Sequence, residues 1–348
     1  MTQTLAPVGE LLDTRPPMLT PEEVAAHVQA HWGLVGQWSA LTSERDQNYR
    51  LTTADGSYVV KIANAAEPHA MTRFQNRALR HVAGRDGALP VPRVCAARQG
   101  ADDVLLPEGH LMRVLTWVEG MPLHQTPASR AQSGALARMA AGLTRALAGF
   151  VDPAADHVLQ WDIKRAADLR PLLQYVTDSG LRAACTDVLV RFDRVVAPAL
   201  PDLPWQVVHG DLNPHNVLAD PGDSDRIAGI LDFGDMVLTP RICDLAVAAS
   251  YRMEGDDPVG SLAAFAGAYH AVLPLTADER RVLFDLVAAR MVTTVAITSW
   301  RATKYPENAA YILRNVPSAR AGLQAFAMAD RDHVKRALAL ACPEKDMT

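Results

Sequence analysis

The chain has 348 residues, of which 49% are hydrophobic and 21% are charged, and this composition is ordinary for a globular protein with a sizeable core. At this length the chain forms one large domain or two modest ones. The formal net charge of −5 gives no electrostatic reason to expect a nucleic-acid partner, because such proteins usually carry a basic face.

The four cysteines are scattered along the sequence, without the close pairs of a metal site or the density of a disulfide framework. We therefore expect a reducing compartment. The N-terminal segment lacks the basic region and the long apolar region of a secretory signal. No apolar run approaches the roughly 18 residues that a membrane helix needs, so we expect a soluble, cytoplasmic protein without a membrane partner.

The first expected element is a helix that begins after Thr20. Residues 1–18 contain three prolines and little periodicity, and we expect a tail there. Thr20 is a good N-cap and Pro21 suits the first helical position. The two acidic residues that follow favour the positive end of the helix dipole.

A β-hairpin follows this helix. Strands are predicted over residues 46–53 and 57–63, because these stretches flank Asp55-Gly56, a strong signal for a hairpin turn. The second strand holds Lys61 within an otherwise apolar run. The preceding turn, residues 43–48, is polar and contains no G-x-G-x-x-G pattern.

The β-rich part of the sequence ends near residue 121. A helix is predicted over Met71–Val82, and strands are predicted over 93–98 and Leu111–Val118. Glu119-Gly120 interrupts the last strand, and helical patterns dominate afterwards. We therefore expect a tail (1–18), an N-terminal lobe (19–114), a linker (115–121) and a C-terminal lobe (122–348).

The remainder of the chain is predicted to be mainly helical. The expected helices cover residues 128–150, 165–177, 180–199 and 240–250, and then about 259–342 with breaks at Pro274 and Pro306. No internal repeat or low-complexity run interrupts this pattern.

The most informative stretch is Val207–Asp235. Two short apolar runs, Trp205–Val208 and Ile227–Leu231, are predicted to be strands separated by one hairpin. The first delivers the cluster His209-Gly210-Asp211 with Asn216, and the second delivers Asp232-Phe233-Gly234. These clusters fit H-x-D-L-x-x-x-N and D-F-G, the two halves of a kinase catalytic centre.

The chemistry of phosphoryl transfer explains these residue types. The reaction needs one carboxylate near the acceptor hydroxyl and oxygen ligands that hold Mg²⁺ against the phosphates. Asp211 suits the first role, and Asn216 and Asp232 suit the second. Turn capping explains each residue singly, but it does not explain their joint spacing.

The segment resembles the aminoglycoside phosphotransferase-like family of small-molecule kinases, which are relatives of the protein kinases. Residues 230–251 and 42–51 are most similar to the hydroxylysine kinase-type branch of this family. The resemblance covers nearly the whole chain after about Leu19. It implies an α+β, two-lobed protein-kinase-like fold with a small β-rich N-terminal lobe and a large, mainly helical C-terminal lobe.

The resemblance also implies how a nucleotide binds between the lobes. Lys61 corresponds to the phosphate-binding lysine of the kinase V-A-I-K strand. The polar turn 43–48 takes the place of the glycine-rich loop, with Ser43 or Asn48 against phosphate oxygens, although an ordinary solvated turn is the alternative. Gln75 stands where a glutamate partner of Lys61 is expected. The linker residues Leu115, Thr116, Trp117 and Val118 are expected to bind the purine through their main chain, with ATP and GTP both open.

Further roles come from the same resemblance. His209 and Asp244 are expected to hold the catalytic loop in place as scaffold residues. The candidates for contact with the acceptor are Trp161, Asp162, His215 and Asp235. For the Trp161-Asp162 pair the alternative is equally open, with Trp161 in the core and Asp162 as an N-cap.

Several features indicate a small-molecule acceptor and not a protein. The position of the arginine in H-R-D is occupied by Gly210, so an arginine that reads activation-loop phosphorylation is missing. Gly234 and Asp244 lie only ten positions apart, and no A-P-E follows. This spacing leaves no room for a peptide-docking segment.

The acceptor itself must carry a hydroxyl. In the C-terminal lobe, acidic residues that suit an ammonium and basic residues that suit a carboxylate are Glu254, Asp256, Asp257, Asp285, Arg290, Arg301 and Lys304. This mixture suits a zwitterionic hydroxyamino acid of the hydroxylysine type. The alternative is that these residues are solvated helix faces.

We therefore predict a phosphotransferase that uses Mg²⁺, a nucleoside triphosphate and an alcohol acceptor. Homoserine-like, choline-like or aminoglycoside acceptors are the alternatives to a hydroxylysine-like one. An alternative of another class is a nucleotide-binding pseudokinase that acts through partners, which the unusual Gln75 and the missing glycine loop favour. The sequence makes no prediction of the oligomeric state.

Overall fold

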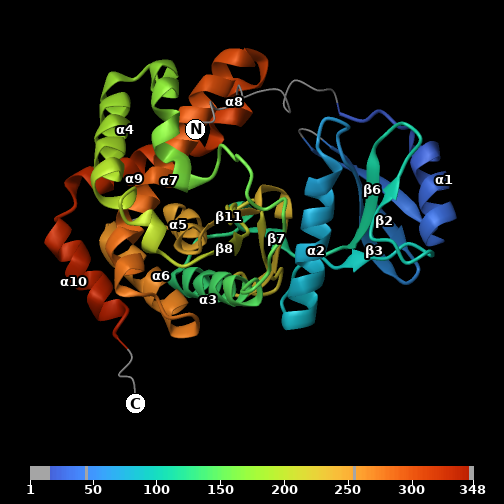
Figure 1. Ribbon diagram of the computed structural model, residues 1–348, viewed down its shortest axis with the longest axis horizontal. Coiled ribbons are helices and arrows are strands. Elements are labelled where there is room, and N and C mark those ends of the chain that lie inside the picture. Colours follow the sequence, from blue (N-terminus) through green and yellow to red (C-terminus); the bar gives the residue numbers. More distant parts are fainter. Residues whose placement is uncertain (1–15, 44–45, 254–255, 345–348) are drawn as a thin grey trace. The chain divides into compact units, whose positions relative to one another are not determined.

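The structure is a computed structural model that describes residues 16–43, 46–253 and 256–344 (Figure 1). The chain divides into two compact units, each built from more than one stretch of sequence. Unit 1 consists of Met1–Glu119, Asp152–Ala155 and Ala228–Gly234. Unit 2 consists of Gly120–Val151, Asp156–Ile227 and Asp235–Thr348.

An antiparallel six-stranded sheet forms the centre of unit 1, with its strands in the order β1-β2-β3-β6-β4 and with β5 also paired to β6. The elements of unit 1 are α1 (Pro21–Trp32), β1 (Gln37–Leu41), β2 (Gln47–Thr53), β3 (Gly56–Ile62), α2 (His69–Arg85), β4 (Val94–Cys95), β5 (Val104–Leu105) and β6 (Leu111–Thr116). The β2–β3 turn lies at the predicted Asp55-Gly56, with Thr53 opposite Gly56. The predicted hairpin is thus confirmed.

The two faces of this sheet carry different chemistry, because successive residues of a strand point to opposite faces. Val60 and Met112 belong to the apolar cluster that also holds Val24 and Val28 of α1. Lys61 and Arg113 occupy the alternate positions on β3 and β6 and lie opposite each other in the register. Figure 1 shows the sheet of unit 1 between α1 and α2.

The start of α1 follows the sequence prediction. The side chain of Thr20 accepts a hydrogen bond from the Glu23 amide, and Glu23 accepts one from the Thr20 amide, which completes a capping box. Helix α2 has no side-chain cap and is longer than predicted, because Pro68 and not Met71 precedes its first turn. Arg77 of α2 donates to both carboxylate oxygens of Asp152 (2.6 and 3.0 Å), which ties residues 152–155 to unit 1.

Unit 2 is mainly helical. Its α-helices are α3 (Arg130–Ala146), α4 (Ser179–Arg191), α5 (Ile242–Ser250), α6 (Pro258–Val272), α7 (Ala277–Lys304), α8 (Ala309–Ile312), α9 (Val316–Met328) and α10 (Arg331–Ala341). Shorter 3₁₀ segments cover Leu123–Gln125, Ile163–Tyr175, Leu200–Asp202, Phe233–Asp235, Pro306–Asn308 and Leu313–Asn315, and Phe192–Val196 forms a π-helical turn. The predicted breaks at Pro274 and Pro306 are confirmed.

Helix α7 is the core helix of unit 2. It packs against α4, α5, α9 and the 3₁₀ segment Ile163–Tyr175. Its length and composition alone would allow it to cross a membrane, so the expectation that no apolar stretch reaches that length is wrong. The apolar window of α7 is nevertheless 94% buried, as in the core helix of a globular protein.

Two strand pairs of unit 2 lie beside these helices. They are β8 (Trp205–Val208) with β11 (Val237–Pro240), and β7 (Met121–Pro122) with β9 (Val217–Ala219). Strand β10 spans Ile227–Ile230. The strand that leads to the first motif, β8, pairs with β11, a pairing that the sequence did not predict.

Other predicted boundaries also need correction. Strand β1 escaped prediction because it is mostly exposed and does not alternate. The strand predicted over 93–98 shrinks to Val94–Cys95, since Pro92 precedes it and a turn follows. The helix predicted over 165–177 is a 3₁₀ segment that contains Pro171, whose missing N–H is incompatible with a regular α-helix interior.

Candidate active site

The H-G-D loop after β8 is held by one buried carboxylate. Asp244, in the first turn of α5, accepts hydrogen bonds from the amides of His209 (3.3 Å) and Gly210 (2.8 Å). Burial raises the pKa of Asp244, although the charge of His209 and the two amides oppose that shift. The His209 ring is fully buried, and its Nδ1 accepts from the amide of Asp211 (3.2 Å).

Gly210 is required by the shape of this loop. Its φ angle is +82°, in the left-handed region that favours glycine. A Cβ atom at this position would lie 2.3 Å from the carbonyl oxygen of Asp235. The absence of an H-R-D arginine therefore has a backbone cause, because only glycine fits between these two segments.

The carboxylate of Asp211 lies at the centre of a polar network. Its Oδ2 accepts from Asn213 Nδ2 (2.7 Å) and from Asn216 Nδ2 (2.8 Å). Its Oδ1 forms an ion pair with Arg290 Nη2 (2.7 Å). The side chain of Asp211 is 19% exposed, so it is oriented from several sides and still reaches solvent. The side chains of Asp211 and Asn216, which are five positions apart in the motif, are thus in contact, as the motif predicts.

Arg290 enters this network from α7, 79 positions further along the chain. Its side chain is only 3% exposed, and Nη2 also donates to the hydroxyl of Tyr251 (3.2 Å). The guanidinium lies over the rings of Trp161 (5.2 Å) and Tyr251 (6.0 Å). Burial alone would lower the pKa of Arg290, but the charges of Tyr251, Asp211 and Asp235 outweigh it and the pKa is raised.

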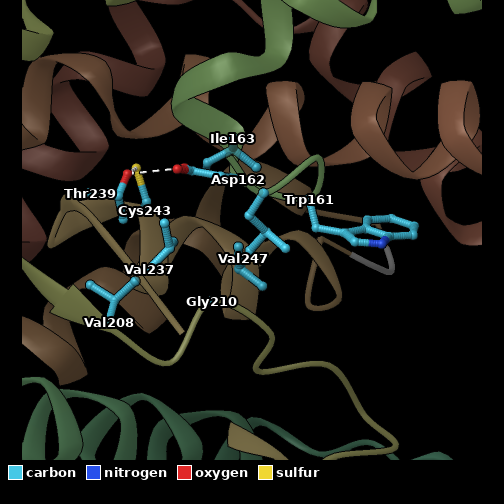
Figure 2. Close-up of a pocket in the computed structure, with 10 residues that line it drawn as sticks. Trp161, Asp162, Ile163, Val208, Gly210, Val237, Thr239, Cys243 and Val247 are labelled. Atoms are coloured by element: carbon cyan, nitrogen blue, oxygen red, sulfur yellow. Dashed lines mark hydrogen bonds between the residues drawn. The ribbon is translucent and has the colours of Figure 1, made fainter. Parts of the chain in front are cut away.

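A small, largely apolar pocket of unit 2 lies beside this loop. Its lining includes Trp161, Asp162, Gly210, Thr239 and Cys243. Figure 2 shows the Trp161 indole at one end of this pocket and Thr239 with Cys243 at the other. The pocket combines a polar backbone edge at Gly210 with an aromatic wall.

Asp162 lines this pocket and has a structural role. Its side chain accepts from the Lys164 amide (3.1 Å) and caps the following 3₁₀ segment. It also forms an ion pair with Lys164 and accepts from the hydroxyl of Thr239 (3.0 Å). The N-cap interpretation of Asp162 is thus confirmed, whereas the half-buried Trp161 contacts Arg290 beside Asp211.

The second motif and Lys61 belong to unit 1. Lys61 Nζ lies 3.9 Å from Asp232 Oδ1, and their side chains are 18% and 56% exposed. Asp232 has a φ angle of +58°, which makes it the non-glycine residue with a left-handed backbone in the described part of the chain. Such conformations cost about 1–3 kcal/mol and gather at functional sites. The long, exposed ion pair leaves both side chains accessible to a ligand.

Gln75 has a different partner from the one predicted. Its Oε1 accepts a hydrogen bond from Arg113 Nη2, and Arg113 Nη1 donates to Asn76 Oδ1 (2.9 Å). All three side chains are buried. Among the described residues Lys61 forms an ion pair with Asp232, so of the two possible partners of Lys61, Gln75 or a residue elsewhere, the structure shows the second.

The turn that precedes β2 is described only in part, because Glu44 and Arg45 lie outside the described residues. Ser43 Oγ accepts from the amide of Asp46 (3.1 Å). Asn48 lies opposite Lys61 in the β2–β3 register. Its Oδ1 is buried without a hydrogen-bond partner among the described residues, so a ligand group can satisfy this amide.

The linker residues are partly engaged within unit 1. The amides of Thr116 and Trp117 donate to the carbonyl oxygens of Arg93 (2.9 Å) and Ser57 (3.0 Å). The Trp117 ring lies under the guanidinium of Arg50 (4.2 Å). Leu115 pairs with Val59 and Val94 in the sheet. Of the four residues predicted to bind the purine, Val118 is the one that takes part in none of these sheet and turn contacts.

His215 lies in a second polar cluster of unit 2. Its ring centroid is 4.0 Å from that of His124, and its Nε2 accepts from Arg314 Nε (3.4 Å). Burial, helped by the charges of His124 and Arg314, lowers the pKa of His215 to about 4. Asp235 contributes its carbonyl oxygen beside Gly210 and its charge near Arg290.

Most of the other charged candidates have structural roles. Asp257 caps α6 through the Gly260 amide (2.8 Å), and the buried Asp285 pairs with Arg191 and Arg331. Asp256 is exposed, and Lys304 lies over two aromatic rings. Glu254 lies outside the described residues. Among the basic candidates, Arg290 is the one for which the structure describes a contact with Asp211.

Sequence analysis missed several of these contacts. Arg113, Asn213 and Tyr251 escaped because nothing in their local pattern marks them. Arg290 was only one of three basic candidates, although its surroundings in the sequence carry a signal. It follows Ala288-Ala289 and precedes Met291-Val292 in an apolar helix, and a charge in such a run is almost never buried unless it is paired.

Oxygen donors of the kind that Mg²⁺ prefers are available in both motifs. Asn216 donates through Nδ2 to Asp211, which orients its amide and leaves Oδ1 as the group for a cation. The carboxylate of Asp232 is half exposed. Within the described ranges, no cluster of three or more His, Cys, Asp or Glu side chains offers another metal site.

Comparison with known proteins places this site in a family. The model of the phosphotransferase enzyme family matches residues 37–286. A hydroxylysine kinase from Mus musculus is 28% identical over 326 residues, which cover 85% of this chain and 86% of the relative. A homoserine kinase from Methylobacillus flagellatus is 27% identical over 237 residues, which cover 67% of this chain and 69% of the relative.

Solved structures share the fold. The microcompartment-associated aminopropanol kinase has a TM-score of 0.68 at 17% identity, over 87% of this chain and 97% of the other. A spectinomycin phosphotransferase in complex with ADP and its antibiotic has a TM-score of 0.59 at 14% identity, over 93% and 99%. The predicted protein-kinase-like fold, with a β-rich part and a mainly helical remainder, is confirmed.

Within that fold, the paired motifs carry the chemistry of a nucleotide-dependent kinase, and the relatives are kinases that act on hydroxyl groups. The family match covers well over half of the chain and includes both motifs. The chain therefore belongs to the phosphotransferase enzyme family and is a small-molecule kinase with a nucleotide donor and a hydroxyl acceptor.

Proposed function

We propose that this kinase transfers the γ-phosphoryl group of ATP or GTP to the side-chain hydroxyl of a hydroxyamino acid of the hydroxylysine type. The observation that carries this proposal is the similarity to hydroxylysine kinases along most of both chains, at 28% identity for the relative from Mus musculus. The homoserine kinase matches a shorter part of the chain. Both names denote kinases of α-amino acids that bear a side-chain alcohol.

Asp211 is the residue that we assign to the acceptor hydroxyl. Two amide donors and one guanidinium fix its carboxylate, so the group needs little reorganisation when an alcohol binds. In phosphoryl transfer of this type the carboxylate orients the hydroxyl and takes its proton late, because the transition state is loose. Asn213 and Asn216 contribute to phosphoryl transfer by orienting Asp211.

Lys61 and Asp232 are the residues that we assign to the donor. The Lys61 ammonium offsets charge on the phosphates, and Asn48, opposite it in the hairpin, supplies a buried amide for a phosphate oxygen. An amide can present either its oxygen or its nitrogen after rotation. Asn216 Oδ1 and the Asp232 carboxylate would hold Mg²⁺. When bound, this ion neutralises charge that develops on the phosphates.

The alternative functions receive less support. A homoserine-like acceptor is the second candidate, because a curated homoserine kinase matches two thirds of the chain. A pseudokinase receives less support because the relatives are kinases and because Asn213, Asn216 and Arg290 hold the Asp211 carboxylate in place. A cytoplasmic location remains part of the proposal, since all four cysteines are free thiols.

The test is an acceptor panel with the purified protein, Mg²⁺, and either ATP or GTP. The panel contains hydroxylysine, homoserine, choline, aminopropanol and aminoglycosides, and products are identified by mass spectrometry. Phosphohydroxylysine as the product with the highest kcat/KM is the expected result. A higher kcat/KM with an acceptor that is not an amino acid would overturn the proposal and leave the family assignment intact.

A further inference from the structure

The polar network around Asp211 contains a cation that is not fully satisfied. Arg290 Nη2 is bonded to Asp211 and Tyr251, but Nε and Nη1 are buried and have no hydrogen-bond partner among the described residues. A guanidinium carries five N–H donors in a rigid fork. Buried donors without acceptors are costly in folded proteins, and a bound water, ion or ligand group usually satisfies them.

The surroundings of Arg290 suggest which ligand is absent. Its side chain is 3% exposed, and Asp211 supplies one carboxylate oxygen to it. A second carboxylate would accept a charge-assisted hydrogen bond from Nη1 or from Nε, which point to different sides of the guanidinium. An ammonium has no acceptor for these donors, and a neutral carbonyl or hydroxyl oxygen accepts a weaker hydrogen bond than a carboxylate does, so the site favours an acid.

The position of this cation determines what the acid is part of. Arg290 contacts the same carboxylate that we assign to the acceptor hydroxyl. Trp161 and Tyr251 lie near its guanidinium, and both residues are half-buried, so each is partly open to solvent. A small molecule that reaches Asp211 with its hydroxyl therefore has Arg290 within reach of its other polar groups.

We propose that Arg290 binds the carboxylate of the acceptor and makes this kinase selective for hydroxyamino acids over the corresponding amino alcohols. This inference rests on the proposed function, because it names the group of the hydroxyamino acid that the enzyme recognises. Arg290 is a specificity-determining residue in this scheme. The phosphoryl group still passes from the nucleotide to the acceptor oxygen, and the carboxylate takes no part in the bond changes.

A competing role for Arg290 gives a different experimental result. If Arg290 only positions Asp211, its loss slows every acceptor by the same factor. If it also binds the acceptor carboxylate, its loss costs more for an acceptor that has this group. The comparison of two acceptors that differ only in the carboxylate therefore separates the two roles.

The experiment compares hydroxylysine with its amide and with its decarboxylated diamino alcohol. We expect the wild-type kcat/KM for hydroxylysine to exceed that for the amide about 10- to 100-fold, the usual effect of a hydrogen bond to a charged group. In Arg290→Gln this ratio should fall to about one. Arg290→Lys, which keeps the charge but loses the fork, should give an intermediate ratio.

Controls keep the result interpretable if a variant folds poorly. Arg281→Gln changes a 54% exposed arginine of the same helix, and its ratio should equal that of the wild type. Because each variant is compared with itself on two acceptors, a partly folded preparation lowers both rates and leaves the ratio unchanged. Thermal melting of each variant identifies the folded fraction.

The outcomes separate this inference from the proposed function. Equal wild-type activity on hydroxylysine and its amide, or an unchanged ratio in Arg290→Gln, overturns the role of Arg290 while hydroxylysine remains the acceptor. Wild-type activity confined to alcohols without a carboxylate overturns both. A high ratio that collapses in Arg290→Gln supports both.

Discussion

The two regions that carry the kinase motifs differ in how tightly their side chains are held. In unit 2, Asp211 has three hydrogen-bonding partners at 2.7–2.8 Å, and the loop before it is fixed by the buried Asp244. In unit 1, Lys61 and Asp232 are 3.9 Å apart and Asp232 is half exposed. With the roles that we propose, the acceptor side is thus held by short contacts, whereas the donor side has a longer ion pair that a nucleotide and its cation can reorder.

This difference has a physical reason. A neutral hydroxyl binds a carboxylate only weakly and cannot order its side chain. The protein must therefore hold this carboxylate in position before the acceptor binds. Phosphates and a divalent cation bring strong charges that can order a lysine and an aspartate when they bind. Changes in unit 2 should therefore reduce turnover or stability, and changes in unit 1 should mainly affect nucleotide binding.

The largest effect is expected for Asp211→Asn. Loss of the carboxylate that orients the hydroxyl and accepts its proton should lower kcat by about 10²- to 10⁴-fold. Nucleotide binding, measured by isothermal titration, should change little. Asp187→Asn, an exposed carboxylate of unit 2, is the control and should keep wild-type kcat. Normal turnover of Asp211→Asn would remove this residue from the mechanism.

Gly210→Ala tests whether the catalytic loop is as rigid as its contacts indicate. The left-handed φ costs about 1–2 kcal/mol for a residue with a Cβ atom. The clash with the Asp235 carbonyl oxygen at 2.3 Å requires a further backbone shift, which we expect to add about 1–3 kcal/mol.

The matched control is Gly100→Ala in unit 1. Gly100 has a φ of +84°, close to that of Gly210, but its added Cβ would meet nothing within 4 Å. Urea unfolding should therefore show a loss of about 1–2 kcal/mol for Gly100→Ala and a clearly larger one for Gly210→Ala. Equal losses of unfolding free energy in the two variants would show that the backbone shift in the Gly210 loop costs no free energy.

Lys61→Met tests the unit 1 side of the comparison. Removal of the ammonium should lower kcat/KM for the nucleotide about 10- to 100-fold, the range expected for hydrogen bonds to a charged group. The KM for the acceptor and the melting temperature should stay near their wild-type values. Arg80→Met, an exposed cation of α2, is the control. An effect confined to the acceptor KM would contradict the donor role.

Asp244→Asn tests the scaffold of the loop through its pH dependence. An amide cannot accept from both the His209 and Gly210 amides as well as a carboxylate does, so we expect a loss of about 1–3 kcal/mol in the free energy of unfolding. Burial raises the pKa of Asp244, so the folded protein binds this proton more tightly than the unfolded chain.

The sign of the pH effect follows from that proton. As the pH rises from about 4, the unfolded chain releases it first, and the contribution of Asp244 to the free energy of unfolding falls. The stability difference between the wild type and Asp244→Asn should therefore shrink as the pH rises from 4. Urea unfolding at a series of pH values measures it, and a difference that grows with pH would contradict the raised pKa.

The sequence predicted what depends on short spacing. The capping box at Thr20, the Asp55-Gly56 hairpin and the approach of Asn216 to Asp211 each involve residues at most five positions apart. Such contacts follow from local backbone geometry, and so the motif predicted them. The pairing of β8 with β11 and the contact of Arg290 with Asp211 join distant segments, and only the packing of unit 2 determines them.

Gln75 shows why an aligned position alone is not enough. Register places Arg113 directly opposite Lys61, so two cationic side chains are neighbours on the same face of the sheet. Burial lowers the pKa of Arg113. The amides of Gln75 and Asn76 are what satisfy its guanidinium, so the position that holds a glutamate in other kinases serves a different cation.

Gln75→Glu should therefore have the smallest effect on catalysis of the changes considered. The new carboxylate would pair with Arg113 and leave the Lys61–Asp232 contact unchanged, so the nucleotide KM should stay within about twofold of the wild type, as for a charge that makes no contact with the ligand. Initial rates at varied nucleotide concentration measure it. A KM at least tenfold lower would mean that a carboxylate at this position reaches Lys61, and that the looseness of the donor residues comes from the missing glutamate. An unchanged KM would mean that the long distance between Lys61 and Asp232 does not come from the missing glutamate. The charges of the bound nucleotide and its cation would then order these two side chains.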